Sequence, residues 1–204
     1  MNIKPKQVFS TYRWEGNTGL DNVKYCSHCG MKFVQKMRRG RERLICPKCG
    51  FTHYRNPYPG VVVLIIENGS VLLGKRAKGC FLEGKWCLPG GFIEYEENFL
   101  SAAKREVKEE TALDIEVLSI ISVVTNYFTP DLHTLVIVLL ARITGGNLCP
   151  GDDIDELKWF PLSKPFPEMA FEADEHIITR FWNTELEGAP IDPDLAFSIE
   201  NSSP

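Results

Sequence analysis

Three glutamates, at positions 106, 109 and 110, stand in a segment that contains neither glycine nor proline from residue 98 to residue 111. At 3.6 residues per turn, a helix would carry all three carboxylates within a narrow arc of one face. Like charges at these spacings cost roughly 0.2–0.5 kcal/mol per pair unless a counter-charge neutralises them. Oxygen ligands in this number favour a hard divalent cation, Mg²⁺ or Mn²⁺, which also binds phosphate oxygens. The alternative is a solvated helix whose glutamates pair with Lys104 and Lys108.

Four cysteines form a second constellation with metal-ligand spacing. Two CxxC pairs are separated by 16 residues and comprise Cys26, Cys29, Cys46 and Cys49. This spacing is typical of a tetrahedral zinc ribbon, and the glycine after each pair permits the tight turn that directs backbone amides at sulfur. Two redox-active CxxC motifs are the alternative. His28 lies inside the first pair, but four thiolates already complete the zinc shell, so we expect it on the surface.

The elements that must position these residues follow from hydrophobic periodicity. Residues 98–111 place Phe99, Ala102, Ala103 and Val107 on one side and charges on the other, which predicts an amphipathic helix. The turn signal at 67–70 separates two apolar runs and predicts a hairpin. A strand pair joined at Arg39-Gly40 is expected between the cysteine pairs. The remaining predicted elements are strands at 61–66, 71–73, 115–125, 134–143 and 157–160 and a helix at 173–186.

Charge divides the chain near Gly60. Residues 1–60 hold 12 Lys+Arg against 3 Asp+Glu, or +9, and the remainder holds 11 against 24, or -13, which sums to the net charge of -4. The split suggests a basic module that faces an anion and an acidic module that binds cations, although the two halves would also simply attract each other. We predict an arm at 1–23, a zinc ribbon at 24–56, a catalytic domain at 57–186 and a loosely held tail at 187–204. The proline-rich joint at 56–60 marks the main boundary.

Composition indicates an ordinary globular protein. The chain has 204 residues, 44% of them hydrophobic and 25% charged, with no apolar run of about 18 residues and no secretory leader. We therefore expect a cytoplasmic protein without a membrane partner. Seven cysteines in a reducing compartment favour metal ligands and buried thiols over disulfides, and burial is the prediction for Cys80, Cys87 and Cys149.

The glutamate segment resembles the signature box of the Nudix hydrolase superfamily. It reads Gly91-x5-Glu97-x7-Arg105-Glu106-Val-Lys-Glu109-Glu110-Thr-Ala112-Leu, which keeps the spacing of the family's Gly, Glu and Arg-Glu-aliphatic-x-Glu-Glu positions. The family's closing glycine is Ala112 here. That glycine ends the helix, where a residue often needs a positive φ that alanine tolerates poorly. We therefore expect a strained turn at this point but no lost ligand.

The resemblance implies a fold and a set of roles. The fold would be an α/β/α sandwich around a mixed sheet, preceded by the ribbon. Glu106 and Glu110 would bind Mg²⁺ or Mn²⁺ with help from Glu109, and Arg105 would orient the box by pairing with Glu97. A backbone carbonyl near Gly90 or Gly91 would complete the sphere. The reaction implied is hydrolysis of a phosphoanhydride, with the general base left open among Glu109, Glu94 and Glu156.

A ribbon directly before the box is similar to the zinc-ribbon Nudix subgroup over residues 24–186. The Ser-Gln-Pro-Trp array of the NADH pyrophosphatases is missing, whereas Asp155–Phe160 and Pro167–Phe171 are similar to elements of FAD and ADP-ribose pyrophosphatases. The resemblance therefore favours ADP-ribose or FAD as substrate. We name Arg76, Tyr127 and Phe128 as substrate contacts, although such aromatics also serve in sheet cores.

Three alternatives to that substrate stay open. The first is NADH or a dinucleotide polyphosphate, and the second is the cap of an RNA. The third is a nucleic-acid-binding regulator in which the basic run at 36–43 binds the nucleic acid and the Nudix domain is a sensor. The expected partners are a small nucleotide substrate and, by resemblance, a second copy of the chain in a homodimer; nucleic acid is not the expected partner.

Overall fold

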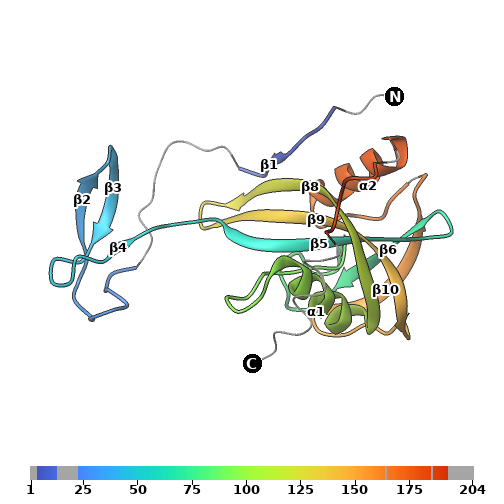
Figure 1. The fold of residues 1–204 in the computed structure, drawn as a ribbon, viewed down its shortest axis with the longest axis horizontal. Coiled ribbons are helices and arrows are strands. Elements are labelled where there is room, and N and C mark those ends of the chain that lie inside the picture. Colours follow the sequence, from blue (N-terminus) through green and yellow to red (C-terminus); the bar gives the residue numbers. More distant parts are fainter. Residues whose placement is uncertain (1–3, 13–22, 164, 185, 193–204) are drawn as a thin grey trace. The chain divides into compact units, whose positions relative to one another are not determined.

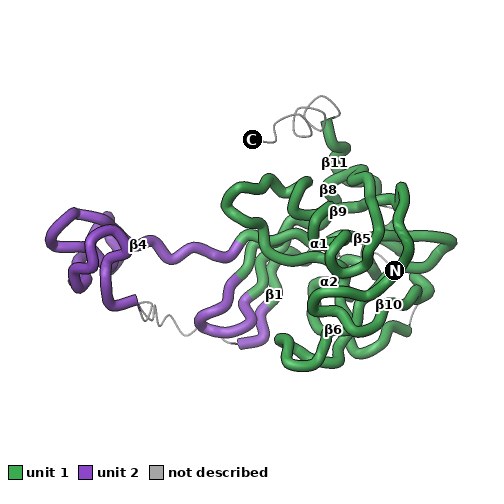
Figure 2. Tube along the Cα trace, turned by 90° about the horizontal axis from the view of Figure 1, so that it is seen from below, with its two compact units in different colours: residues 1–9, 59–126, 134–204 green, residues 10–58, 127–133 purple. Residues whose placement is uncertain are grey.

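The computed structural model describes residues 4–12, 23–163, 165–184 and 186–192 (Figure 1). The chain divides into two compact units, shown in different colours in Figure 2. Unit 1 comprises residues 1–9, 59–126 and 134–204, and unit 2 comprises residues 10–58 and 127–133. The glutamate segment belongs to unit 1 and the four cysteines belong to unit 2, so each constellation has its own structural framework.

One sheet organises unit 1. In the described residues it has eight strands, with the order β1-β8-β9-β5-β6-β10, and β11 and β7 pair with β8 and β6. Val61, Val63 and Ile65 of β5 face one apolar cluster, whereas Leu64 faces another, as the twofold alternation of a strand requires. The strands are β1 (Val8–Ser10), β5 (Tyr58–Glu67), β6 (Ser70–Arg76), β7 (Trp86–Cys87), β8 (Leu113–Thr129), β9 (Leu132–Gly146), β10 (Ile154–Pro161) and β11 (Ala189–Pro190).

Two helices cover the two faces of this sheet. The helix α1 (Phe99–Thr111) contributes Ala103 and Val107 to the first cluster, and α2 (Glu172–Thr184) contributes Ile177 and Ile178 to the second (Figure 1). Because every strand residue points to one of two opposite sides, each helix packs on its own side of the same sheet. The predicted α/β/α sandwich with a mixed sheet is confirmed.

The ends of α1 have local causes. Asn98 caps the helix, and its side-chain oxygen accepts hydrogen bonds from the backbone N–H groups of Leu100 and Ser101 at 3.0 and 3.1 Å. At the other end Ala112 has φ 58° and ψ 11°, and its N–H donates to Lys108 O at 2.9 Å. The left-handed turn expected from the missing glycine is present, and alanine accepts the strain.

Several elements are longer or more numerous than predicted. The strands β8 and β9 extend beyond the predicted 115–125 and 134–143, and β5 begins at Tyr58, inside the proline-rich joint. Pro59 fits there because it offers only its carbonyl, which accepts a hydrogen bond from Ile93 N at 3.2 Å. The sequence pattern does not predict β1, β7 or β11, because runs of two or three residues are too short to show a period.

The predicted arm and tail each contain a short strand. Residues 8–10 form β1 against β8, and Gln7 O accepts a hydrogen bond from Thr125 N at 2.8 Å. At the other end Ala189 pairs with Ile120 through β11. These pairings correct the expectation of an irregular arm and a loose tail for the residues concerned. Residues 13–22 and 193–204, including Trp14, lie outside the described residues.

The ribbon in unit 2 is a small antiparallel sheet with the order β2-β3-β4. Its strands are β2 (Val34–Arg38), β3 (Arg41–Ile45) and β4 (Thr52–His53). The predicted join is confirmed, because Arg39 and Gly40 form the turn with φ values of 50° and 75°. Positive φ at both central residues is the requirement of a two-residue type I′ hairpin. The turn therefore fixes the register of the two strands.

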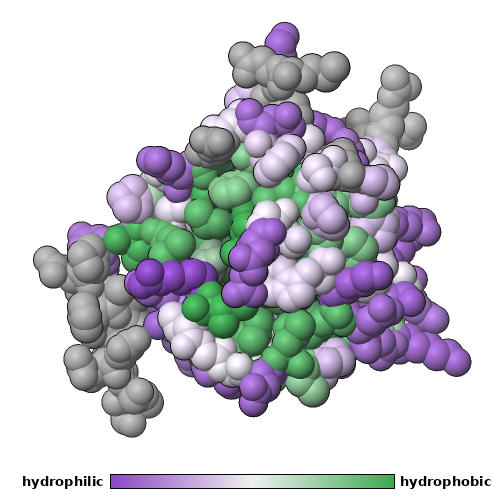
Figure 3. Space-filling model, turned by 90° about the vertical axis from the view of Figure 1, so that its right-hand side faces the viewer, coloured by the Kyte–Doolittle hydropathy of each residue, from purple (hydrophilic) through white to green (hydrophobic). Residues whose placement is uncertain are grey.

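Surface apolarity gives no separate indication of function. On the face in Figure 3, apolar side chains reach the surface between hydrophilic ones. Such mixing is ordinary, since more than half of a folded protein's accessible surface is contributed by apolar atoms. No helix among the described residues is both long enough and apolar enough to span a membrane.

Candidate active site

Glu106 and Glu110 of α1 lie against a glycine turn that follows β7. The backbone N–H of Gly90 donates to Glu110 Oε2 at 2.8 Å, and a Cβ on Gly91 would lie 2.5 Å from the Glu106 carboxylate. Gly90 has φ +147°, and a Cβ there would meet Val61 O at 2.2 Å. Gly90 therefore requires glycine for its backbone, whereas at Gly91 the Glu106 carboxylate fills the space that a Cβ would occupy.

Arg105 joins the glutamates into one network. Its Nε and Nη2 donate to the two oxygens of Glu97 at 2.6 and 2.8 Å, and Nη1 donates to Glu106 at 2.8 Å and to Glu109 at 3.0 Å. Nη2 also donates to Phe92 O at 3.1 Å. The bidentate bond lowers the pKa of Glu97 from its usual value. The guanidinium thus ties the helix to the loop that precedes it.

The three box glutamates do not share one environment. Glu106 and Glu110 are buried, with 8% and 2% of their surface exposed, whereas the Glu109 side chain is 47% exposed. The ligand atoms of the cysteine tetrad all lie within 4.8 Å of one another. Among the described residues, no other group of three or more potential ligand side chains is gathered in this way. Glu106 and Glu109 accept hydrogen bonds from Arg105, whereas Glu110 accepts one from Gly90 N.

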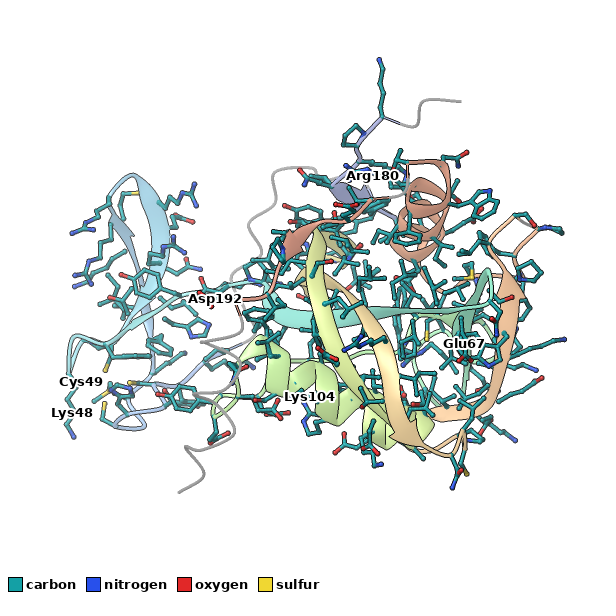
Figure 4. The ribbon with its side chains drawn as sticks, turned by 45° about the vertical axis from the view of Figure 1, so that its right-hand side comes forward. Lys48, Cys49, Glu67, Lys104, Arg180 and Asp192 are labelled. Atoms are coloured by element: carbon teal, nitrogen blue, oxygen red, sulfur yellow. The ribbon has the colours of Figure 1, made fainter. Side chains whose placement is uncertain are left out.

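The solvated-helix alternative finds no support in the lysine contacts that are described. Lys108 Nζ donates to Asp114 Oδ1 at 2.8 Å and to Ala112 O at 3.2 Å, away from the box glutamates. Figure 4 marks Lys104 on α1, where the residue is exposed. The glutamates take their positive partner from Arg105 instead, which is itself a member of the box.

Two acids that sequence reasoning missed, Asp152 and Asp153, lie beside the buried glutamates. The charge of Asp153 raises the pKa of Glu110, and the charge of Asp152 raises the pKa of Glu106. The loop that carries them is fixed to the end of α1, because Gly151 N donates to Glu110 O at 3.1 Å. A Cβ on Gly151 would lie 2.5 Å from Glu109 O, so only glycine permits this approach. The only sequence feature that could have indicated these two acids was the Gly-Asp-Asp segment before β10.

The ionisation of the two buried glutamates indicates what this cluster can hold. Burial raises the pKa of Glu106, against the lowering effect of Arg105, and burial raises the pKa of Glu110 well above its usual value. Two ionised carboxylates repel each other, so the charged forms of Glu106 and Glu110 are favoured by a bound cation. Oxygen donors that need positive charge are the ligands a divalent cation prefers. The donor set therefore fits Mg²⁺ or Mn²⁺.

Arg76 and Glu156 line a surface cavity of about 430 Å³. Arg76 Nη2 donates to Asp153 Oδ2 at 2.6 Å, and its Nε donates to Phe81 O at 2.6 Å. Glu156 instead pairs with Lys75 at 3.5 Å on the exposed side of β10. Of these two predicted site residues, Arg76 therefore contacts Asp153, whose charge acts on the buried Glu110.

Asp174 of α2 supports the glycine turn from the opposite face of the sheet. Its Oδ2 accepts a hydrogen bond from Leu88 N at 3.0 Å, two residues before Gly90. Asp174 is 2% exposed, and its burial raises its pKa to about 7. The turn is therefore held by Asp174 on one side and by Glu110 on the other.

The cysteine tetrad of unit 2 has the geometry of a metal site. The Sγ atoms of Cys29 and Cys46 are 3.4 Å apart, and those of Cys26 and Cys49 are 3.6 Å apart. Disulfide sulfurs lie about 2.05 Å apart, so these thiols are not paired covalently. Gly30 and Gly50 both have positive φ. Their backbone N–H groups donate to Cys26 O and Cys46 O, which closes the two predicted tight turns. Four sulfurs gathered at one point favour a metal over two independent redox pairs.

The other predicted residues have different outcomes. Cys87 is buried as predicted, but Cys80 is half-buried and Cys149 is exposed, which corrects the expectation of three buried thiols. Cys149 lies on the surface because its loop runs over the end of α1, where its N–H donates to Thr111 O at 3.0 Å. Tyr127 and Phe128 belong to unit 2, where their carbonyls accept hydrogen bonds from Thr11.

Two family models match the chain. The NUDIX domain model matches residues 56–181, and the Nudix N-terminal model, which describes a zinc ribbon, matches residues 24–55. The first match contains α1, the glycine turn and the acidic loop. The second contains all four cysteines of the tetrad.

Curated relatives and solved structures agree with these matches. The chain is 37% identical over 128 residues to an ADP-ribose pyrophosphatase of Methanocaldococcus jannaschii, covering 61% of this chain and 73% of that protein. It is 27% identical over 152 residues to an NAD-capped RNA hydrolase of Stutzerimonas stutzeri, covering 74% of this chain and 52% of that protein. A crystal structure of a NUDIX hydrolase from Nitrosomonas europaea matches with a TM-score of 0.67 and 29% identity, covering 79% of this chain and 91% of that one.

Proposed function

The chain belongs to the Nudix family of pyrophosphohydrolases, and on this premise we propose that it hydrolyses the pyrophosphate bond of ADP-ribose. The choice of substrate is supported by the 37% identity to an ADP-ribose pyrophosphatase, of whose length the chain covers nearly three quarters. FAD is the second small-molecule candidate, because it carries the same ADP group on a pyrophosphate.

The observation that carries the proposal is the contact between two buried glutamates of α1 and the glycine turn. Glu106, Glu110 and the backbone of Gly90 would hold Mg²⁺ or Mn²⁺, with Asp153 as a further oxygen donor. A divalent cation bound there withdraws charge from phosphate oxygens and lowers the cost of placing an anion beside carboxylates. The buried acids thereby become a site for a pyrophosphate rather than a barrier to it.

The remaining box residues take distinct roles in this proposal. Arg105 keeps Glu106 in place and is itself fixed by Glu97, so both act as positioning residues. Glu109 is the exposed member of the cluster, and we assign it the acceptance of a proton from the attacking water. Its bond to Arg105 Nη1 would orient the carboxylate toward that water.

Only a few residues are assigned as substrate contacts. Arg76 lines the cavity of about 430 Å³ and touches Asp153, so it would meet the phosphate groups of a substrate in that cavity. Glu156 lines the same cavity but is paired with Lys75, and we assign it no proton transfer. Tyr127 and Phe128 remain candidates for stacking on a base.

An NAD-type cap on RNA is the second candidate substrate. It is supported by several NAD-capped RNA hydrolases that are 25–28% identical to the chain, although the chain spans about half the length of these relatives. Such a cap also contains a pyrophosphate between two nucleosides, so the chemistry at the buried acids would be the same.

Three further assignments accompany the enzymatic one. The cysteine tetrad would bind one structural Zn²⁺, because four clustered thiolates match its tetrahedral preference. Free thiols of this kind fit a reducing compartment, and we assign the protein to the cytoplasm. Family resemblance supports a homodimer.

The test is a panel of ADP-ribose, FAD, NADH, diadenosine polyphosphates and NAD-capped RNA, each assayed with Mg²⁺ and with Mn²⁺. We expect AMP and ribose 5-phosphate from ADP-ribose, at the highest kcat/KM of the panel. Glu110→Gln should reduce kcat by about 100-fold or more while the folded state persists. A variant with the wild-type rate, or no cleavage of any member of the panel, would refute the proposal.

A further inference from the structure

The hairpin of the ribbon carries its positive charge on one face. In the register of β2 and β3, Lys36 stands opposite Arg43 and Arg38 stands opposite Arg41. Directly opposed residues, and residues two apart along a strand, point to the same side of a sheet. These four cations therefore share one face, which we call the cationic face. Figure 4 shows the nitrogen-tipped side chains along this hairpin, with the sulfur atoms near Cys49 at its base.

This arrangement works against the stability of the hairpin. Like charges directly opposite each other on neighbouring strands are destabilising. The hairpin contains two such pairs in succession, and Glu42 lies on the other face, opposite Met37. Among the described residues, Arg39, Arg41 and Arg43 have no ion pair with a carboxylate. Within the part of the chain that the structure describes, these three arginines therefore lack a carboxylate counter-charge.

The turn adds a fifth cation under strain. Arg39 has φ 50°, a left-handed conformation that asparagine or glycine adopts more readily at this position of a type I′ turn. Stability alone would favour one of those residues. Arg39 instead extends the row of positive charge to the tip of the hairpin, where it lines the same cavity as Arg38, Arg41 and Arg43.

An aromatic ring borders the cationic face. Tyr54 follows β4 directly, and the guanidinium carbon of Arg43 lies 5.3 Å from the centre of its ring. Tyr54 is 56% exposed, and together with four of the arginines it lines a cavity of about 280 Å³. A stacking ring beside phosphate-binding cations is the combination by which proteins hold single-stranded nucleic acid, because every base presents a flat π face.

The charge of the whole ribbon has the same sign. Residues 24–55 contain nine Lys+Arg and one Asp+Glu, which gives 9 - 1 = +8. Along each strand, same-face residues repeat every roughly 6.6–6.8 Å, so Lys36 and Arg38 on one strand and Arg41 and Arg43 on the other form two parallel rows of charge. Rows of this kind complement an extended polyanion better than a compact anion, which would engage only one pair.

We propose that the cationic face of the ribbon binds single-stranded nucleic acid, with the arginines on successive phosphates and Tyr54 stacked on a base. The inference does not rest on the pyrophosphohydrolase activity, since every residue that it uses belongs to the ribbon. The proposal also departs from the sequence-based expectation that nucleic acid is not a partner. The sequence alone did not indicate this face, because the opposed charges are recognised only when the register of the hairpin is known.

The experiment measures fluorescence anisotropy of a labelled 20-nucleotide single-stranded RNA with the full, zinc-loaded chain. A DNA strand of the same sequence and free tripolyphosphate are further arms. We expect binding whose affinity falls as salt rises, and an at least tenfold loss of affinity in the double variant Arg41→Gln/Arg43→Gln. The slope of log K against log[salt] should decrease by about 1.4, since each lost phosphate contact removes about 0.7 for a single strand.

A matched variant separates the face from net charge. Arg142→Gln/Lys158→Gln removes two exposed cations from β9 and β10, so its net charge equals that of the first variant. It should bind the RNA as the wild type does. Tyr54→Leu should weaken the binding of the polynucleotide and leave the binding of tripolyphosphate unchanged. Equal losses in the two double variants, tripolyphosphate bound as tightly as the strand, or no binding of either strand would overturn the proposal, whatever the hydrolase assay gives.

Discussion

The backbone N–H of Gly90 donates a hydrogen bond of 2.8 Å to the buried carboxylate of Glu110. This contact joins the turn after β7 to the last turn of α1, two segments that lie near opposite ends of the box in the sequence. The same turn is held from the other side of the sheet by Asp174 through Leu88 N. The position of the candidate metal-binding carboxylates is therefore determined by both helices, although only one helix carries them.

The substitution Gly91→Ala should lower the activity while the fold is retained. Its Cβ would lie 2.5 Å from the Glu106 carboxylate, the mobile end of a side chain, so Glu106 should move while the backbone stays. We expect kcat to fall by about 10- to 100-fold, because displacements of about 1 Å at a reacting centre have effects of that size. Steady-state kinetics and a thermal melt measure the two quantities. Gly145→Ala is the matched control, since its Cβ would meet nothing closer than 3.4 Å, and it should keep full activity.

Two acids near the cavity allow a direct comparison. Asp153→Asn removes a carboxylate that accepts a hydrogen bond from Arg76 and whose charge acts on Glu110, and we expect at least a tenfold loss of kcat and a higher requirement for Mg²⁺. Glu156→Gln removes an exposed carboxylate that is paired with Lys75, and we expect less than a twofold change. Titrating the metal in both variants measures the effect. The opposite ranking would return Glu156 to the role that the sequence suggested for it.

The difference between those acids also shows what a sequence can predict. The apolar pattern of residues 98–111 predicted α1 and its buried face, because helical periodicity is local, whereas the Arg105–Glu97 pair was implied by the family resemblance. Asp153 could not be predicted in the same way, since it reaches Glu110 only because the loop before β10 bonds to the end of α1. The outer ends of β8 and β9 were also missed, because their half-exposed residues carry a weak apolar pattern. In the ribbon, cysteine spacing predicted the tetrad, whereas the cationic face depends on the cross-strand register.

Zinc content should depend on the tetrad and on no other cysteine. Cys46→Ser replaces a buried thiolate whose Sγ lies 3.4 Å from that of Cys29, so the variant should lose most of its zinc and the ordered ribbon with it. Cys149→Ser changes an exposed thiol outside the tetrad and should keep about one zinc per chain. Elemental analysis of both proteins, purified under reducing conditions, gives the answer. Retention of zinc by Cys46→Ser would remove the ribbon site.

The left-handed residue at the end of α1 predicts a stabilising substitution. Ala112 has φ 58°, and a non-glycine residue in this region costs roughly 1–2 kcal/mol. Ala112→Gly should therefore raise the free energy of unfolding by about 1 kcal/mol and the melting temperature by about 2–4 °C. Lys104→Gly, in the middle of the same helix, should have the opposite sign because glycine destabilises helix interiors by about 1 kcal/mol. A melting temperature lowered by both changes would contradict the assigned strain.

The buried carboxyl of Asp174 should make stability depend on pH. Burial raises its pKa to about 7 in the folded protein, whereas an unfolded aspartate titrates near its ordinary pKa of 3.8. Between these values the folded state binds the extra proton, so the stability that this group contributes is complete below about pH 4 and is lost as pH rises toward 7. Each unit of difference corresponds to about 1.4 kcal/mol.

Asp174→Asn removes this dependence, because asparagine resembles the protonated acid and still offers an oxygen to Leu88 N. We expect the difference in unfolding free energy between variant and wild type to shift by a few kcal/mol in favour of the variant between pH 4 and pH 7. The shifts of Glu106 and Glu110 occur in both proteins and cancel in this difference. Urea unfolding at closely spaced pH values provides the measurement, and parallel profiles for the two proteins would show that Asp174 is already ionised in the folded state.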